Sequence, residues 1–410
     1  MKRNFDHEIL LLQGGGALGS YHAGVYEGLA EAGMMPTWVV GISIGAINAA
    51  IIAGNPPERR VERLREFWYR VSAYAPLTLP SELDPLRPIL DRVSVLSVML
   101  CGVPGFFSTR VPSPLVVPAA SPDLVSFYDT SPLESTLEEL VDFDLLNSGK
   151  MRLSLGAVNV RTGESKYFDT QNTRITPKHV MASGALPPAF SAVEIDGEDY
   201  WDGGLVSNTP ITYVWDQKPL TTALLVQVNL FPSKGEKPTD MVQVLERMKD
   251  IQYSSKQRFT TERLREIGEL RASIGRLLAR MPAHLRDDPD VMRIAKQYDD
   301  REWTIAFLTD THQSNVGQWK DAEFSRTTVD ERWAVGVEAI HRSLANREWT
   351  TPSAEIPGVR VYNLPSGTRR EGATSANGNG NEVGKPKPPS RSFQRSHRRR
   401  ASRAASSRVH

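Results

Sequence analysis

Two short apolar runs near the N-terminus each end in a glycine turn that leads straight into a helical pattern. Residues 9–12 (Ile-Leu-Leu-Leu) precede the loop at 14–19, and residues 38–40 (Trp-Val-Val) precede the turn at 41–45. Apolar runs of this length, bounded by glycines, are typical of buried strands. Two strand–helix units within the first 54 residues predict an α/β fold with a mostly parallel central sheet.

The second turn has the G-x-S-x-G pattern of a nucleophile elbow, with Gly41 and Gly45 flanking Ser43. In such an elbow the serine stands on a sharp strand-to-helix turn, and the glycines remove side chains that would collide. The helix predicted at residues 46–53 directs its N-terminus at the serine and favours negative charge there. The flanking strand and helix favour Ser43 as a nucleophile over a chance match.

The first turn, GGGALG at residues 14–19, also matches the G-x-G-x-x-G pattern of dinucleotide-binding loops. That interpretation requires an acidic residue at the end of the second strand, where Val40 and Gly41 stand instead. Backbone N–H groups without side chains in front of them can alternatively form an oxyanion hole. Because the loop lies within thirty residues of the serine, we favour an oxyanion hole made by Gly14, Gly15, Gly16 and Gly19.

A serine nucleophile needs a base, and the sequence offers two kinds. None of the eight histidines stands in a short glycine-bounded loop of the kind that presents a catalytic imidazole, and we expect His22 to be a core residue. Asp202, followed by Gly203 and Gly204, ends a predicted strand and could accept the serine proton directly. An ordinary Asp-Gly turn is the alternative interpretation of these three residues.

These three motifs, in this order, resemble the patatin-like phospholipase family over roughly residues 8–230. The similarity extends to residues 21–25 after the first loop and to residues 208–211 after the Asp-Gly-Gly motif. It implies a three-layer α/β/α fold and a dyad of Ser43 and Asp202 without histidine. It also implies a lipid ester substrate, no metal and no cofactor, and an oxyanion held by the backbone amides of Gly15 and Gly16.

Two features depart from or extend the family pattern. Many members carry Arg or Lys just before the last glycine of the first loop, where this chain has Leu18, so the preference for a phosphate headgroup stays open. Residues 231–350 are charged and mainly helical, and they resemble an extension found in a bacterial subset of the family. The resemblance implies no activity for this extension.

The segment from about residue 72 to 130 is rich in proline and too apolar for an ordinary connection. Within it, residues 93–107 could form an interfacial lid over an acyl pocket. A hydrophobic cap packed on the sheet is the alternative. We expect this insertion to cover the acyl pocket.

Charge is distributed unevenly along the chain. From residue 365 to 410, eleven Lys or Arg stand against two Glu, so this tail carries +9 and residues 1–364 carry −8 of the overall +1. The tail has few apolar residues and is predicted to be disordered and dispensable for chemistry. It could bind anionic lipid, although a solvated end without a partner is equally compatible, and no specific nucleic-acid partner is expected.

The rest of the composition bears on the compartment. A single cysteine, Cys101, excludes an intramolecular disulfide framework and favours a reducing compartment, so we expect a cytoplasmic protein. Residues 1–7 are a short lead without a secretory signal, and no apolar run is long enough to span a membrane. Peripheral membrane association is compatible with these features, and the oligomeric state is not predicted.

We therefore expect a serine acyl hydrolase of the phospholipase A, lysophospholipase or lipid esterase type. One alternative is a Ser-His-Asp esterase that uses His284, His312 or His341, and another is a non-catalytic lipid- or nucleotide-binding module. The carboxyl ends of parallel strands meet at one sheet edge, so Ser43 and Asp202 are expected to meet there. With an aspartate pKa near 4, activity is expected to persist below pH 6, where a histidine base is protonated.

Overall fold

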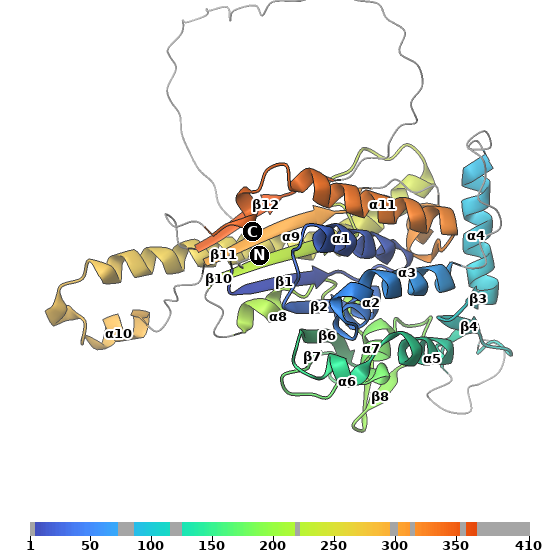
Figure 1. Cartoon of the computed structure of the whole chain (residues 1–410), viewed down its shortest axis with the longest axis horizontal. Coiled ribbons are helices and arrows are strands. Elements are labelled where there is room, and N and C mark those ends of the chain that lie inside the picture. Colours follow the sequence, from blue (N-terminus) through green and yellow to red (C-terminus); the bar gives the residue numbers. More distant parts are fainter. Residues whose placement is uncertain are drawn as a thin grey trace, which may run out of the picture. The chain divides into compact units, whose positions relative to one another are not determined.

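A nine-stranded sheet forms the centre of the protein (Figure 1). The computed structural model describes residues 5–72, 86–114, 125–217, 222–295, 302–311, 316–352 and 358–366. In spatial order the strands are β12 (Gly358–Asn363), β11 (Glu302–Thr309), β10 (Thr222–Asn229), β1 (His7–Leu12), β2 (Trp38–Ile42), β6 (Arg152–Asn159), β9 (Glu198–Asp202) and β8 (Val193–Ile195), with β7 (Ser165–Asp169) paired to β6. The six strands from β12 to β6 are parallel, and β7, β8 and β9 are antiparallel additions. The predicted α/β fold with a mostly parallel sheet is confirmed.

Helices cover both faces of this sheet. On one face lie α1 (Ser20–Glu31), α2 (Ile44–Ala53), α3 (Arg60–Val71) and α11 (Arg326–Ser343), and on the other lie α8 (Ile211–Asp216) and part of α9 (Met241–Ala279). Successive residues of β1 alternate between the two cores: Leu10 and Leu12 belong to the first, and Ile9 and Leu11 to the second. This alternation follows from the two-residue period of a strand, and it produces the predicted three layers.

The C-terminal region contributes to the same sheet. Of the region predicted to be mainly helical, α9, α10 (Pro289–Ala295) and α11 are helices, but β11 pairs in parallel with β10 along eight residues. β12, for which the sequence pattern predicts no strand, continues the sheet beyond β11. A boundary at residue 230 therefore divides neighbouring strands of one sheet, and the described residues all belong to one compact unit.

The predicted insertion contains one long helix and a small sheet. After α4 (Arg87–Cys101), strands β3 (Gly102–Val103), β4 (Phe107–Thr109) and β5 (Tyr128–Asp129) pair antiparallel. The insertion is followed by α5 (Ser131–Leu140) and α6 (Phe143–Leu146), and α7 (Pro177–Gly184) precedes β8. The predicted disordered tail lies, beyond residue 366, outside the described residues. Within the described parts, no helix is both long and apolar enough to cross a bilayer.

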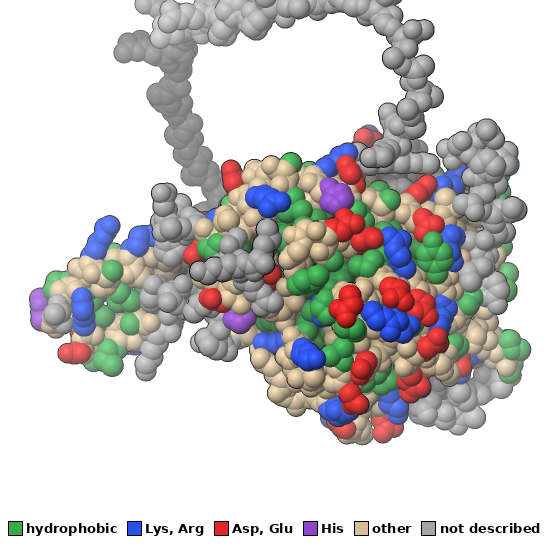
Figure 2. Space-filling view, viewed as in Figure 1, with side chains coloured by type: hydrophobic (Ala, Val, Ile, Leu, Met, Phe, Trp, Pro, Cys, Tyr) green, Lys and Arg blue, Asp and Glu red, His purple; other side chains and the backbone are tan. Residues whose placement is uncertain are grey.

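Charged side chains of both signs are intermixed on the face shown in Figure 2. Several form ion pairs between helices: Arg65 of α3 lies 2.7 Å from Glu27 of α1, and Arg70 lies 2.7 Å from Glu139 of α5. Exposed pairs of this kind contribute at most about 1 kcal/mol each. The buried apolar residues of the two cores therefore account for most of the stability of these layers.

Candidate active site

Ser43 occupies a strained turn between β2 and α2. Its φ of 57° lies in the left-handed region, which a non-glycine residue adopts only where the surrounding structure enforces it. A Cβ at Gly41 would collide with the carbonyl of Gly45, and one at Gly45 would collide with the carbonyl of Leu12. Both flanking positions therefore require glycine, as predicted for a nucleophile elbow.

The strand β6 brings Asp202 to this serine. Ile42, the last residue of β2, pairs with Gly156 of β6, and Asp202, the last residue of β9, pairs with the next residue, Ala157. β7 pairs with residues 154–158 of β6, a stretch that overlaps the residues paired with β2 and those paired with β9. β7 therefore lies on one edge of β6, and both β2 and β9 lie on the other edge. β2 is parallel and β9 antiparallel to β6, so their carboxyl ends meet head to head.

This arrangement corrects the expected route by which the two residues meet. Asp202 does not end a parallel strand, because β9 runs against β6. The meeting of Ser43 and Asp202 is nevertheless present, because the Ser43 side chain lies near enough to the Asp202 carboxylate to lower its pKa. The Gly204 N–H donates a hydrogen bond to the same carboxylate at 2.7 Å. Gly203 is buried, with its Cα against the carbonyl of Gly156.

The C-terminal end of α7 holds both residues in place. The Ser43 N–H donates to the carbonyl and to the hydroxyl of Ser183, each at 3.1 Å. The Ser183 hydroxyl in turn donates to the Gly156 carbonyl at 2.6 Å, and the Asp202 N–H donates to the Ala185 carbonyl at 3.0 Å. Ser183 was not predicted from the sequence, because a serine near the end of a short helix carries no distinctive pattern.

Asp202 is an unusually basic carboxylate. Its side chain is buried, and burial raises its pKa from 3.8 to about 6, although the nearby Ser43 side chain and the hydrogen bond from the Gly204 N–H act in the opposite direction. The expectation that activity persists below pH 6 assumed an ordinary aspartate pKa; with a pKa of about 6, we expect activity to fall as the pH drops below 6. A higher pKa also makes the carboxylate a better general base near neutral pH.

The glycine loop lies directly beside the serine. A Cβ at Gly14 would come within 3.1 Å of the Ser43 Cβ, so the loop faces the elbow. The N–H groups of Gly15 and Gly16 begin the short 3₁₀ helix η1 (Gly16–Gly19), and neither donates a hydrogen bond within the described residues. Gly16 has φ +54° and no room for a Cβ, because the Asp321 carbonyl lies against it. Two free N–H groups beside a serine can hold an oxyanion.

Two asparagines fix this loop. The Asn208 side chain donates to the Gly14 carbonyl at 2.9 Å, which joins the glycine loop to the loop after Asp202. The Asn48 side chain donates to the Gly19 carbonyl at 2.9 Å and lies 3.4 Å from the Nδ1 atom of His22. His22 is fully buried, and burial lowers its pKa from 6.5 to about 3, so it is a neutral core residue as expected.

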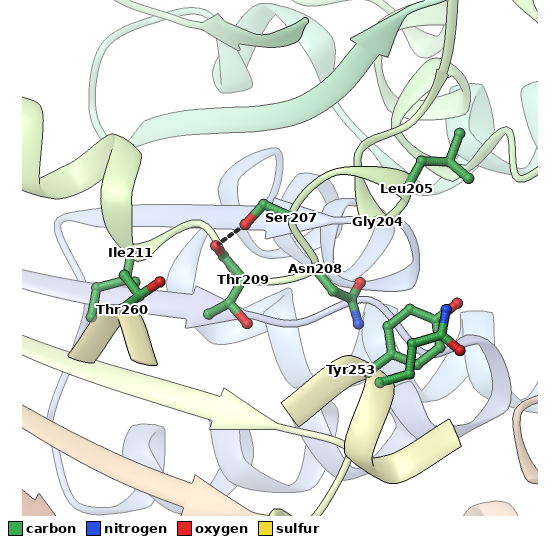
Figure 3. A pocket seen from close by; sticks show the side chains of 9 residues that line it. Gly204, Leu205, Ser207, Asn208, Thr209, Ile211, Tyr253 and Thr260 are labelled. Atoms are coloured by element: carbon green, nitrogen blue, oxygen red, sulfur yellow. Dashed lines mark hydrogen bonds between the residues drawn. The ribbon is translucent and has the colours of Figure 1, made fainter. Parts of the chain in front are cut away.

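A cavity of about 330 Å³ opens above the serine and aspartate. Ser43, Asp202 and the loop glycines lie at its floor, and apolar side chains of the insertion and of the loop after α7 line much of its wall, including Val98, Met99, Phe106, Phe107, Tyr128, Leu186 and Phe190. A smaller cavity of about 60 Å³ lies next to this large cavity, between α9 and the loop after Asp202 (Figure 3). In Figure 3, Asn208 and Tyr253 come from these two segments, and both residues also line the large cavity.

No histidine lines the large cavity among the described residues. His341 lies at the surface, 2.8 Å from Glu31, and His284 is exposed on the 3₁₀ helix that follows α9. His312 is outside the described residues. In the described parts of the chain, no cluster of three or more His, Cys, Asp or Glu side chains could hold a metal ion.

Two protein-family models match the chain. The sequence model of a family described as patatin-like phospholipase matches residues 10–215, half of the chain. A second family model, described as patatin phospholipase, matches residues 251–355. Among curated proteins, none matches the chain.

Several solved structures are similar at low identity. VipD from Legionella pneumophila aligns with 15% identity over 80% of this chain and 66% of its own, with a TM-score of 0.33. Human GIVD cytosolic phospholipase A2 aligns with 12% identity over 54% of this chain and 42% of its own, with a TM-score of 0.31. ExoU from Pseudomonas aeruginosa, solved with SpcU, aligns with 17% identity over 61% of this chain and 48% of its own, with a TM-score of 0.25. The chain thus spans between 42% and 66% of the length of these proteins.

Proposed function

The chain belongs to the patatin-like phospholipase family, and from this premise we propose that it is a serine acyl hydrolase that cleaves carboxylic ester bonds of lipids. The observation that carries the proposal is that Ser43 and Asp202 lie side by side in the lining of one largely apolar cavity. A lipid acyl chain fits such a cavity because its burial there removes apolar surface from water. The activity is of the phospholipase A, lysophospholipase or lipid esterase type.

In the proposed reaction the Ser43 Oγ attacks the ester carbonyl carbon while its proton passes to the Asp202 carboxylate. The carbonyl oxygen becomes an oxyanion, which accepts hydrogen bonds from the N–H groups of Gly15 and Gly16. When the carbonyl re-forms, the bond to the alcohol breaks, and the protonated Asp202 returns its proton to the leaving oxygen. A water molecule, deprotonated by the same carboxylate, then attacks the acyl-enzyme. The bond between the acyl carbon and Ser43 Oγ breaks, the protonated Asp202 returns the proton to Ser43 Oγ, and the fatty acid is released.

The surface of α4 supports peripheral association with a lipid layer. Ile89, Val93, Leu96 and Leu100 recur at helical spacing on one side of α4 and are 46% to 65% exposed. The helix also places Val98 and Met99 in the wall of the large cavity. An apolar helical stripe of this kind normally faces a core, so its exposure beside a lipid site indicates an interfacial surface.

A covalent probe tests the proposal most directly. A fluorophosphonate reacts with an activated serine, so we expect it to label the wild-type protein and not Ser43→Ala. The same two proteins should be compared on a panel of phospholipids, lysophospholipids and neutral acylglycerols. Equal labelling of Ser43→Ala, or lipid hydrolysis that survives this substitution, would refute the assignment of the nucleophile.

A further inference from the structure

The lining of the large cavity includes a charged pair that the acyl chemistry does not use. Apart from Asp202, the only charged side chains that line it in the described part of the chain are Lys249 and Asp321. Lys249 belongs to α9, and Asp321 belongs to η7 (Gly317–Ala322), so both come from the C-terminal region. A cavity whose wall is largely apolar and carries one pair of opposite charges suits an amphiphile.

The two side chains form an ion pair that leaves part of each group available. The Lys249 ammonium donates to Asp321 Oδ2 at 2.7 Å and to the Gln318 carbonyl at 2.8 Å. One of its three N–H donors and the second oxygen of Asp321 therefore have no partner among the described residues. The side chains are 21% and 26% exposed, so both are within reach of a ligand in the cavity.

A neighbouring ion pair shows what a purely structural pair looks like in this region. Lys320 lies 2.6 Å from Asp250, and the two side chains are only 4% and 8% exposed. Neither residue lines the large cavity, whereas Lys249 and Asp321 do. The contrast indicates that the Lys249–Asp321 pair is directed at a ligand as well as at the fold.

We propose that Lys249 and Asp321 form the headgroup site for a zwitterionic phospholipid, with the phosphate at Lys249 and the ammonium at Asp321. This proposal rests on the lipid hydrolase function proposed above. A zwitterion can satisfy both charges at once, whereas an anionic headgroup would gain from Lys249 and be repelled by Asp321. Trp319 belongs to η7 together with Asp321, lines the cavity and is 47% exposed, so its ring can contact the ammonium.

The glycine loop itself contains no basic residue. Leu18, just before the last glycine of the loop, is buried in the core. The loop therefore provides no cation for a phosphate. Lys249 provides a cation in the same cavity from the C-terminal region, which gives that region a role in substrate selection.

Headgroup preference should follow the two charges. In the full-length protein, we expect Lys249→Met to lower the ratio of phosphatidylcholine to diacylglycerol hydrolysis, at equal acyl chains, by about tenfold, the usual effect of losing a hydrogen bond to a charged group. Asp321→Asn should raise the ratio of phosphatidylglycerol to phosphatidylcholine hydrolysis several-fold. Arg263→Met, which removes an exposed charge elsewhere on α9, is the matched control and should change neither ratio.

A binding measurement separates this proposal from the catalytic one. Ser43→Ala protein should bind a single-chain alkylphosphocholine, below its micelle concentration, more tightly than the matching fatty alcohol, and adding Lys249→Met should remove most of that difference. If wild-type protein hydrolyses no lipid while this binding pattern holds, the proposed reaction fails and the headgroup site stands. If both ratios and the binding difference stay within about twofold in the Lys249 and Asp321 variants, the headgroup site is refuted.

Discussion

Asp202 should carry a stability cost that its replacement removes. Its carboxyl group is 2% exposed, and burial raises its pKa from 3.8 to about 6. A difference of about two pH units corresponds to about 3 kcal/mol. The folded state binds the Asp202 proton more tightly than the unfolded state does. Protonation of Asp202 therefore favours the folded state fully below about pH 4, and this stabilisation is lost as the pH rises through about 6.

Asp202→Asn is neutral at every pH and keeps an oxygen that can accept the Gly204 N–H. At pH 8 we therefore expect this variant to be more stable than the wild type by about 2–3 kcal/mol, because the variant does not bury a charge. For a unit of 369 residues this corresponds to a melting temperature about 3–4 °C higher, at about 2.1 cal/mol/K per residue. At pH 4.5 the difference should shrink to about 1 kcal/mol, because the wild-type carboxyl is then largely protonated when folded.

The same variant should lose activity. Removal of a general base typically costs a factor of about 10² or more in turnover, which can be measured on a soluble short-chain ester. Asp250→Asn is an informative contrast, because burial also raises the Asp250 pKa but Lys320 pairs with it. Its loss leaves a buried ammonium with fewer partners, so Asp250→Asn should destabilise the fold.

Thermal and urea unfolding at the two pH values, together with ester turnover, check this reasoning. If Asp202→Asn is less stable than the wild type at pH 8, or if the difference is the same at pH 8 and pH 4.5, burial does not set the pKa of this group. Near-full turnover in the variant would refute the assignment of Asp202 as the base.

Three further outcomes follow from the site. On a soluble ester, kcat/KM should fall below a midpoint near pH 6 as Asp202 becomes protonated; full activity at pH 5 would contradict this. His341→Ala and His284→Ala should each keep turnover within about twofold of the wild type, and a histidine variant that abolished it would favour a histidine base instead. Leu96→Ser should weaken sedimentation with phospholipid vesicles by about five- to tenfold, since about half of a leucine's transfer free energy is lost. Leu277→Ser on α9, where the leucine is 66% exposed against 55% for Leu96, should have little effect.

The site residues could be predicted where the chain imposes a local geometric requirement. The glycines at 41 and 45 are required by close backbone approaches, and the strands and helices around them have clear apolar patterns. Such requirements are visible in a short window of sequence, so the two glycine turns could be located between a strand and a helix. The strands β1 and β2 and the helix α2 were predicted for the same reason.

Features that depend on distant contacts could not be predicted. The direction of β9 relative to β6 is set by pairing across the sheet, and strand pattern alone does not specify it. The pKa of Asp202 depends on its burial, which only the assembled fold determines. Ser183 and Lys249 form hydrogen bonds to residues far along the chain, so no local pattern identifies them.

The role of β6 explains how two residues 159 positions apart can form one precise contact. Gly156 and Ala157 are consecutive, and each pairs with the residue that ends one of the two converging strands. The distance between Ser43 and Asp202 is thus set by one peptide unit of β6, and the Ser183 contacts to both Ser43 and Gly156 keep that unit in register. One extra residue at this point in β6 would displace the two chain ends by about 3.3 Å, which exceeds the reach of a hydrogen bond. The contact therefore tolerates variation in the long segments between the motifs, but none in the strand that joins them.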